Sequence, residues 1–212
     1  SGYMKIKNYI FLILMLIYAG VYPEELWRLT KNDSEVVVYQ RTDAGSDSER
    51  FLAIAAIDET ARNIFTITGD ISANRDWMAD CIHSELIKKI SDNEVIEYYI
   101  TSPPWPVIKR DSVIKIKFSR ISSYKFRLDM NALPEGEAEK FVIKDPEMVR
   151  IYTMSGFVDI EENSGKTGIR FGVTGGPGGR VPDFIVRWGG WRIPYNTLKG
   201  LRKFVLFKKG QK

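Results

Sequence analysis

Alternating apolar and polar positions recur through the middle of the chain, and they predict an antiparallel sheet. Two runs, 34–40 and 50–57, are rich in β-branched and apolar residues and flank the polar stretch 44–48, which indicates a β-hairpin. Further strands are expected at 83–90, 94–101, 112–121, 124–130, 148–155, 157–162 and 167–174. Short runs separated by polar or glycine-containing turns are typical of a meander of antiparallel strands.

The segment 58–81 breaks this alternation and predicts a helix between two strands. Asp58 and Thr60 are candidate N-caps at its start, because their side-chain oxygens can accept hydrogen bonds from the free N–H groups of a first turn. The apolar residues that follow recur at near-helical spacing.

A second helical segment is expected at the C-terminus. It begins at Pro182, since proline is favourable at the first helical position. Its apolar face carries Leu198, Leu201 and Val205. Gly189-Gly190 and Pro194 fall inside the segment, so one bent helix and two pieces joined near 189–195 both fit the sequence. Strands followed by a closing helix indicate an α+β fold, with helices laid on one face of a curved sheet.

The strand period also predicts which side chains face the final helix. Along 112–121, Ile114, Ile116 and Phe118 share one side, and lysines occupy the other. The same rule groups two further stripes: Tyr124, Phe126, Leu128 and Met130, and Ile169, Phe171 and Val173. We expect these apolar stripes to point inward, either as a plain core or as the lining of a cavity.

Composition narrows the classes of function. The 212 residues are 44% hydrophobic and 27% charged, which fits one folded domain with a sizeable core. A single cysteine and a single histidine argue against an internal disulfide, a four-ligand zinc site and a histidine-based triad. The formal net charge of +4 is too small to indicate a nucleic-acid binder. We therefore expect no metal, no cofactor and no nucleic-acid partner.

The first residues are expected to lie outside the folded domain. Lys5 and Lys7 form a positive start, an apolar run follows, and Ala19-Gly20 supplies the small residues of a cleavage site. The predicted organisation is a cloning remnant at 1–3, a signal peptide or N-terminal anchor at 4–20, and the domain at 21–212. Cleavage near Ala19-Gly20 implies export to the periplasm or the extracellular space; an uncleaved anchor and a retained N-terminal helix are the alternatives.

A set of short motifs, weak singly, forms a recognisable order along the chain. The first half carries Trp27-Arg-Leu, Val38-Tyr-Gln-Arg41, Trp77, Tyr98, Pro103-Pro-Trp-Pro106 and Arg110-Asp111. The second half carries Asp145-Pro-Glu-Met-Val-Arg150, Gly165-Lys-Thr167, the stretch from Gly175 to Pro182, and Leu198-Lys-Gly-Leu-Arg202. Together they resemble the START domain, the steroidogenic-acute-regulatory-related lipid-transfer module. The resemblance covers residues 24–207.

The resemblance implies a helix-grip fold. In this family a strongly curved antiparallel sheet wraps around a long C-terminal helix, with a central hydrophobic cavity of lipid size between them. Two features depart from the family's pattern: the Gly-Gly and Pro of the last helix, and the short Ser122-Ser123 turn near the place of a loop that guards the cavity. Both bear on the shape of the cavity entrance.

Polar side chains placed in such a cavity must be paired or hydrogen-bonded, because an isolated buried ion is very costly. The expected ligand-binding residues are Glu97, Tyr99, Arg110, Ile116, Phe118, Phe126, Arg150, Tyr152, Met154, Phe171, Ile185 and Trp188. Arg150 is expected to meet a ligand headgroup or to pair with Glu97. The alternative is that Arg150 lies at the rim and Arg110-Asp111 caps a turn.

The C-terminal end of the chain is basic and aromatic, which suits a transient contact with an anionic membrane. The expected docking residues are Trp191, Lys199, Lys203, Lys208 and Lys209, and the alternative is an ordinary solvated helix face.

Two functions remain. The first is a monomeric, non-enzymatic protein that binds a lipid or another hydrophobic molecule and exchanges it at membranes. The second is an enzyme that resembles polyketide aromatase/cyclases on the same fold. An enzyme would need a cavity acid whose hydrogen-bonded partner lets it exchange protons with the ligand. The lone His83, without a clear acid/base pair, favours the first function, and we predict no catalytic residue.

Overall fold

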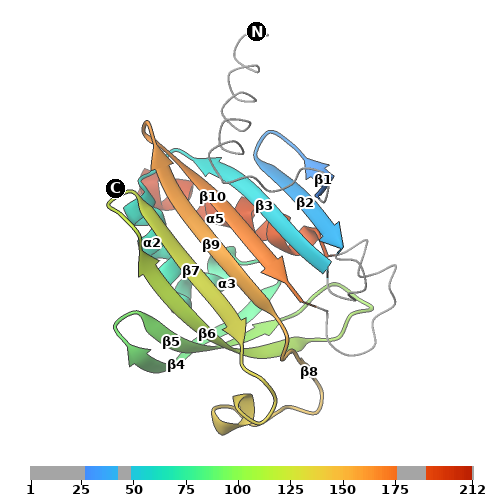
Figure 1. Cartoon of the computed structure of the whole chain (residues 1–212). Coiled ribbons are helices and arrows are strands. Elements are labelled where there is room, and N and C mark those ends of the chain that lie inside the picture. Colours follow the sequence, from blue (N-terminus) through green and yellow to red (C-terminus); the bar gives the residue numbers. More distant parts are fainter. Residues whose placement is uncertain (1–26, 43–48, 176–189, 212) are drawn as a thin grey trace.

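The computed structural model describes residues 27–42, 49–175 and 190–211 (Figure 1). The predicted signal peptide, the turn at 44–48 and the start of the predicted C-terminal helix lie outside these residues. Within them, ten strands form one sheet: β1 (Arg28–Asn32), β2 (Val36–Thr42), β3 (Glu49–Ile57), β4 (Cys81–Ser91), β5 (Glu94–Thr101), β6 (Arg110–Arg120), β7 (Lys125–Ala132), β8 (Val149–Arg150), β9 (Ser155–Asn163) and β10 (Lys166–Thr174).

The strands lie in the order β1-β2-β3-β10-β9-β7-β6-β5-β4, and all these neighbours are antiparallel. The short β8 pairs with the start of β6 in parallel. Figure 1 shows the sheet curving around the C-terminal helix α5 (Arg192–Gly210), which lies across its inner face. The α+β helix-grip architecture expected from the sequence is confirmed.

The predicted helix over 58–81 is correct at its start and wrong in its length. Thr60 is the N-cap, and its hydroxyl accepts the Asn63 N–H at 3.3 Å. Asp70 then adopts an extended conformation and ends the helix. The segment therefore divides into α2 (Ala61–Gly69), the 3₁₀ turn η2 (Ile71–Ala73) and α3 (Asn74–Trp77), and Cys81 already belongs to β4.

The described part of the C-terminal helix begins within the predicted junction at 189–195. Residues 190 and 191 form a turn, and α5 starts at Arg192. Pro194 is the third residue of α5, where a proline is tolerated because the first four N–H groups of a helix have no partner within it. The predicted first piece, from Pro182, lies outside the described residues. Within the described residues, no helix is long and apolar enough to cross a membrane.

Three strand predictions need correction. The segment 148–155 is not a strand, because only Val149–Arg150 pair with β6 before the chain crosses to the edge of β7, where Met154 O accepts the Ala132 N–H. Tyr124 lies in the turn before β7 and is 62% exposed. The polar edge strand β1 has no counterpart among the predicted strands.

The inner face of the sheet forms the main core with α2 and α5. The predicted stripes meet here, and Ile116, Phe126 and Ile169 are buried in one cluster with Leu198 and Leu201. The lysines between them, Lys115 and Lys117, are exposed, as the strand period predicts.

Two contacts fix α5 at its position. Gly200 allows α5 to lie directly on α3, because a Cβ at this position would come within 2.1 Å of the Trp77 carbonyl oxygen. Near its start, α5 is bound to the turn between β1 and β2, where the Tyr195 hydroxyl donates a short hydrogen bond to the Asp33 carboxylate. Lys199 Nζ lies 3.7 Å from Asp33 Oδ2 and 3.4 Å from Glu35 Oε2.

The contacts of Asp33 make the stability of the fold depend on pH. Partial burial by itself would raise the pKa of Asp33. Hydrogen bonds from Tyr195 and from the Val36 and Glu35 N–H groups, with the charge of Lys199, outweigh burial and lower this pKa to about 2. A lowered pKa in the folded state stabilises the protein above the unfolded-state pKa, and this stabilisation is lost as pH falls through the folded-state value.

We therefore predict that Asp33→Asn lowers the melting temperature near pH 6, and that its difference from the wild type shrinks between about pH 4 and pH 2. Thermal unfolding across this pH range measures the effect. Tyr195→Phe, which removes the donating hydroxyl, should reproduce part of it. A difference that stays constant with pH would contradict the role given to Asp33.

Candidate functional site

The inner face of the sheet is covered unevenly. The half that faces α2 and α5 is buried. At the other end, where β7 and β10 finish and β9 begins, Met130, Met154 and Val173 are only partly buried. In the same region, Ala132 has only a methyl side chain and Gly156 has none. This end of the inner face is therefore apolar and only partly buried, and we call it the open end.

Glu97 lies on the inner face beside the open end. Glu97 of β5 lies opposite Ile114 of β6, and Ile114 lies opposite Ala132 of β7, so the three residues form one row across the sheet. The next row on the same face contains Ile116 and Met130. Side chains directly opposite one another on antiparallel strands share a face. Glu97 is nevertheless 3% exposed, so its carboxyl group is buried among apolar neighbours.

Two uncharged side chains bind the Glu97 carboxyl group. Asn74 Nδ2 donates to Glu97 Oε1 at 2.9 Å, and Ser84 Oγ lies 2.6 Å from the same oxygen. Burial raises the pKa of Glu97, and the hydrogen bonds from Ser84 and Asn74 only partly offset this. The Asn74 and Ser84 partners come from α3 and β4, far from Glu97 in sequence, and the strand pattern alone gave no signal for them.

Polar atoms near Glu97 are left without partners. Asn74 Oδ1 and Trp77 Nε1 are buried and have no hydrogen-bond partner within the described part of the chain. Tyr99, two residues along β5 on the same face, packs against the main core, and burial raises its pKa well above the ordinary value. Buried polar groups in native proteins are nearly always hydrogen-bonded, so such atoms call for an explanation.

Arg110 is the second charged residue on the inner face. It begins β6 opposite Thr101, is 6% exposed, and donates to the Ile108 carbonyl oxygen. Burial lowers the pKa of its guanidinium group.

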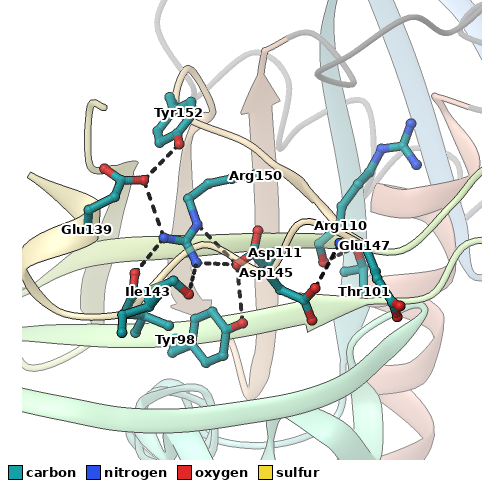
Figure 2. Close-up of polar contacts among 11 residues, drawn as sticks. Tyr98, Thr101, Arg110, Asp111, Glu139, Ile143, Asp145, Glu147, Arg150 and Tyr152 are labelled. Carbon is teal, nitrogen blue, oxygen red and sulfur yellow. Dashed lines mark hydrogen bonds and ion pairs between the residues drawn. The ribbon is translucent and has the colours of Figure 1, made fainter. Parts of the chain in front are cut away.

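Asp111 and Arg150 form a buried ion pair on the opposite, outer face (Figure 2). Both side chains are fully buried. Arg150 Nε donates to Asp111 Oδ2 at 3.0 Å, Arg150 Nη2 makes a shorter contact with the same oxygen, and the Tyr98 hydroxyl donates to it at 3.1 Å. Arg150 Nη1 also donates to the Val142 carbonyl oxygen at 2.6 Å and lies 3.4 Å from Glu139 Oε1.

This network corrects the expected pairing of Arg150 with Glu97, because the two side chains lie on different faces. Tyr152 also belongs to the outer face, where its hydroxyl donates to Glu139 at 2.7 Å, whereas Met154 packs on the inner core. The network holds the segment 133–148, which contains the 3₁₀ turn η3 (Ala138–Lys140), against the outer face.

The remaining expected ligand-binding residues are apolar. Ile116, Phe126 and Phe171 are buried in the main core, and Phe118 packs against it. The Phe126 ring stacks on Phe65 of α2 with 4.5 Å between ring centroids. Ile185 and Trp188 lie outside the described residues.

Most of the expected docking residues on α5 contact the domain itself. Trp191 packs edge-to-face on Tyr195, Lys199 is paired with Asp33 and Glu35 as described above, and Lys209 Nζ lies 2.7 Å from the Asp58 carbonyl oxygen. Lys203 and Lys208 are exposed, beside Phe207. The last turns of α5 meet the end of β3, at the end of the sheet opposite the open end.

Exposed apolar side chains instead gather on two loops at the open end. Trp105, in the loop 102–109 between β5 and β6, is 93% exposed, and Ile108 of the same loop is 57% exposed. Ile143, in the segment 133–148, is 88% exposed. A hollow of about 610 Å³ is lined by residues of the two loops and of adjacent strands, among them Ile82, Ile100, Trp105, Ile108, Asp145 and Met148.

No group of three or more metal-ligating side chains occurs in the described ranges.

The ion pair of Asp111 and Arg150 gives a prediction about stability. Arg150→Met leaves a buried carboxylate without its counter-ion and should lower the free energy of unfolding by about 3–5 kcal/mol. The double variant Asp111→Leu/Arg150→Met removes both charges and should cost less than the single variant. Urea unfolding measures both, and Arg120→Met, at an exposed arginine, is the control. A single variant no less stable than the double would contradict the prediction.

The comparisons with known proteins agree with this geometry. A family model of the START domain matches residues 22–120. An uncharacterised protein of Pseudomonas aeruginosa is 27% identical over 188 residues, which cover 87% of this chain and 89% of that protein. The phosphatidylcholine transfer protein of Mus musculus is 23% identical over 185 residues, covering 84% of this chain and 82% of that protein.

Solved structures extend the similarity to the fold. The STAR-related lipid transfer protein of Xanthomonas axonopodis superposes with a TM-score of 0.75 at 26% identity, over 84% of this chain and 97% of that one. The human StAR-related lipid transfer protein 5 gives a TM-score of 0.76 at 16% identity, over 100% of this chain and 99% of that one, and shows the shared fold. The matched segment, the relatives and the helix-grip geometry together confirm that this chain resembles START-domain proteins in sequence and in fold.

Proposed function

We propose that this protein binds a lipid against the inner face of its sheet and exchanges it at membranes. The match of residues 22–120 to the START-domain model and the similarity to lipid transfer proteins support lipid binding in general. The observation that carries the proposal for this chain is the open end, where the apolar inner face continues beyond the area covered by α2 and α5. Ligand sites are typically apolar surfaces with a few polar groups, and here the nearby polar groups are those of Glu97 and Asn74.

Burial of the acyl or ring carbons supplies the affinity. Each buried methylene is worth ~0.8 kcal/mol relative to water, so a sixteen-carbon chain is worth on the order of 13 kcal/mol. A membrane offers the same chain nearly as much. Net transfer is then close to balanced, and the protein accelerates exchange by sparing the lipid the passage through water.

The arrangement around Glu97 favours a carrier over a cyclase-like enzyme. A buried acid with a raised pKa is a common feature of proton-transfer sites. The partners of Glu97, however, are an amide and a hydroxyl, which orient the carboxyl group but do not titrate in the physiological range. Glu97 is therefore assigned a role in binding.

The loops that carry Trp105 and Ile143 are the proposed docking surface. They lie at the open end, so a lipid that leaves the inner face there enters a membrane touching these loops. Exposed tryptophan suits the membrane interface, where its ring lies at the level of the lipid headgroups. The exposed lysines of α5 lie at the other end of the sheet and take no part in this contact. Export, expected from residues 4–20, places this exchange in the periplasm or outside the cell.

The first prediction tests lipid binding at the open end. Ala132→Trp places a large ring on the partly buried inner face, where it occupies the space proposed for the ligand. Protein from its own host should carry lipid detectable by native mass spectrometry, and Ala132→Trp should carry at least about tenfold less. Asn131→Trp, one residue away on the exposed outer face, is the matched control. If folded Ala132→Trp carried as much lipid as the wild type, the open end would not be the lipid-binding site.

The second prediction tests the docking surface. The double variant Trp105→Ser/Ile143→Ser removes exposed apolar area and should weaken binding to anionic vesicles about tenfold, since 1.4 kcal/mol corresponds to a factor of ten. Vesicle co-sedimentation and transfer of a fluorescent lipid between vesicles measure the effect. Phe207→Ser, at the exposed end of α5, is the control and should bind vesicles like the wild type. If only Phe207→Ser lost vesicle binding, the docking surface would be the C-terminal end of α5 and not the two loops.

A further inference from the structure

The buried ion pair of Asp111 and Arg150 lies where both loops of the proposed docking surface return to the sheet. Asp111, in β6, is two residues beyond loop 102–109, which carries Trp105. Arg150, in β8, is two residues beyond the segment 133–148, which carries Ile143. Asp111 and Arg150 lie opposite each other in the parallel pairing of β6 with β8. The ion pair therefore joins the bases of the two loops.

Apolar packing holds the first part of the segment 133–148 but not its tip. Ala138 is fully buried in a cluster on the outer face of the sheet, and Phe141 and Val142 pack against this cluster. The next residue, Ile143, is 88% exposed, and Lys144 after it is also exposed. Burial therefore does not fix the backbone at Ile143.

Arg150 supplies polar contacts at the point where this packing ends. Its Nη1 donates to the Val142 carbonyl oxygen at 2.6 Å, and its Nη2 lies 3.4 Å from the Ile143 carbonyl oxygen. Figure 2 shows the guanidinium group between these carbonyl groups and the Asp111 carboxylate. Because guanidinium is planar and holds its donors in a fixed fork, these contacts restrict where the backbone at Ile143 can lie.

The Asp111 carboxylate fixes Arg150 in turn. Its side chain is fully buried, as is that of Arg150, and the Tyr98 hydroxyl donates to it at 3.1 Å. The path from β6 to the exposed tip of the segment thus runs through two side chains that burial and hydrogen bonds keep in place. The side chain of Ile143 is attached to the residue at which this path ends.

From these contacts we propose that Arg150 is a positioning residue of the docking surface, which holds Ile143 in the direction of the membrane beside the loop of Trp105. The inference rests on the proposed function, because it concerns docking by the same two loops. A surface fixed before binding loses less conformational entropy when it binds. Arg150 acts through Ile143 and not by its own contact with lipid, since its side chain is fully buried.

The variant Arg150→Lys tests the inference. Lysine keeps the positive charge opposite Asp111, but its single ammonium group does not reproduce the fork that reaches the carboxylate and both carbonyl oxygens. If Trp105 and Ile143 contribute equally to the tenfold loss predicted for their double variant, Ile143→Ser alone should weaken vesicle binding about threefold. Arg150→Lys should weaken it by about the same factor.

Co-sedimentation with vesicles of equal parts dioleoylphosphatidylglycerol and dioleoylphosphatidylcholine, well below the melting temperature of each variant, measures this effect. Arg127→Lys is the matched control. Arg127 is also an outer-face arginine in an ion pair, with Nη1 2.8 Å from Asp159 Oδ1, but it lies in the middle of β7. This control should bind vesicles like the wild type.

Double variants separate positioning from a general loss of stability. Because Arg150 acts through Ile143, Arg150→Lys combined with Ile143→Ser should still lose only about threefold. Arg150→Lys combined with Trp105→Ser should lose about tenfold, since the two changes affect different loops. A general loss of stability would add to both single variants alike.

A measurement on the native ion pair decides the question if Arg150→Lys does not fold. Spin labels at Pro104→Cys and Lys144→Cys, in a Cys81→Ser background, report the distance between the two loops. The distance distribution should be as narrow as that between labels at Lys117→Cys and Asn131→Cys, which are exposed positions on the neighbouring strands β6 and β7. A much broader distribution would show that the loops are not held together.

The outcomes separate the inference from the proposed function. If the wild type does not bind vesicles, the proposed docking fails and the inference fails with it. If the wild type binds, but either Ile143→Ser or folded Arg150→Lys leaves the binding unchanged, the inference is overturned and the proposed function stands. Losses that add in the double variant of Arg150 and Ile143 would also overturn it.

Discussion

The antiparallel pairing of β6 with β5 and β7 is the constraint on which the site depends. Successive side chains of a strand point to opposite faces, so a shift of one residue would move every polar group to the other side. The register therefore places Arg110 on the inner face and its neighbour Asp111 on the outer face. It also aligns Glu97 with Ile114 and Ala132. One ladder thus decides which charged side chains lie on the inner face and which hold the outer segment 133–148 in place.

The buried charged residues of the two faces have different kinds of partner. On the outer face, Asp111 and Arg150 form an ion pair that ties a long surface segment to β6. On the inner face, the hydrogen-bond partners of Glu97 are uncharged, and burial raises the pKa of its carboxyl group.

Local patterns in the sequence were sufficient for the architecture and insufficient for the polar contacts. The two-residue period identified the inward stripes of β6, β7 and β10, and the α+β order followed from it. The strand predicted at 148–155 was wrong because the chain there crosses between strands, which apolar alternation does not reveal. The pairing of Arg150 with Asp111 and of Glu97 with Asn74 joins residues 39 and 23 positions apart, and it depends on the three-dimensional course of loops and short helices.

The two ends of the sheet carry different roles as a result. At one end, α5 is fixed by Gly200 on α3 and by Lys209 near β3, and the inner face beneath it is closed. At the other end, the inner face is half covered and the adjacent loops expose Trp105 and Ile143. Exposure of a tryptophan ring to water is unfavourable, and transfer of the ring to a membrane interface is favourable. Because these loops border the open end, the proposed contact with a membrane would place the bilayer next to the apolar inner face.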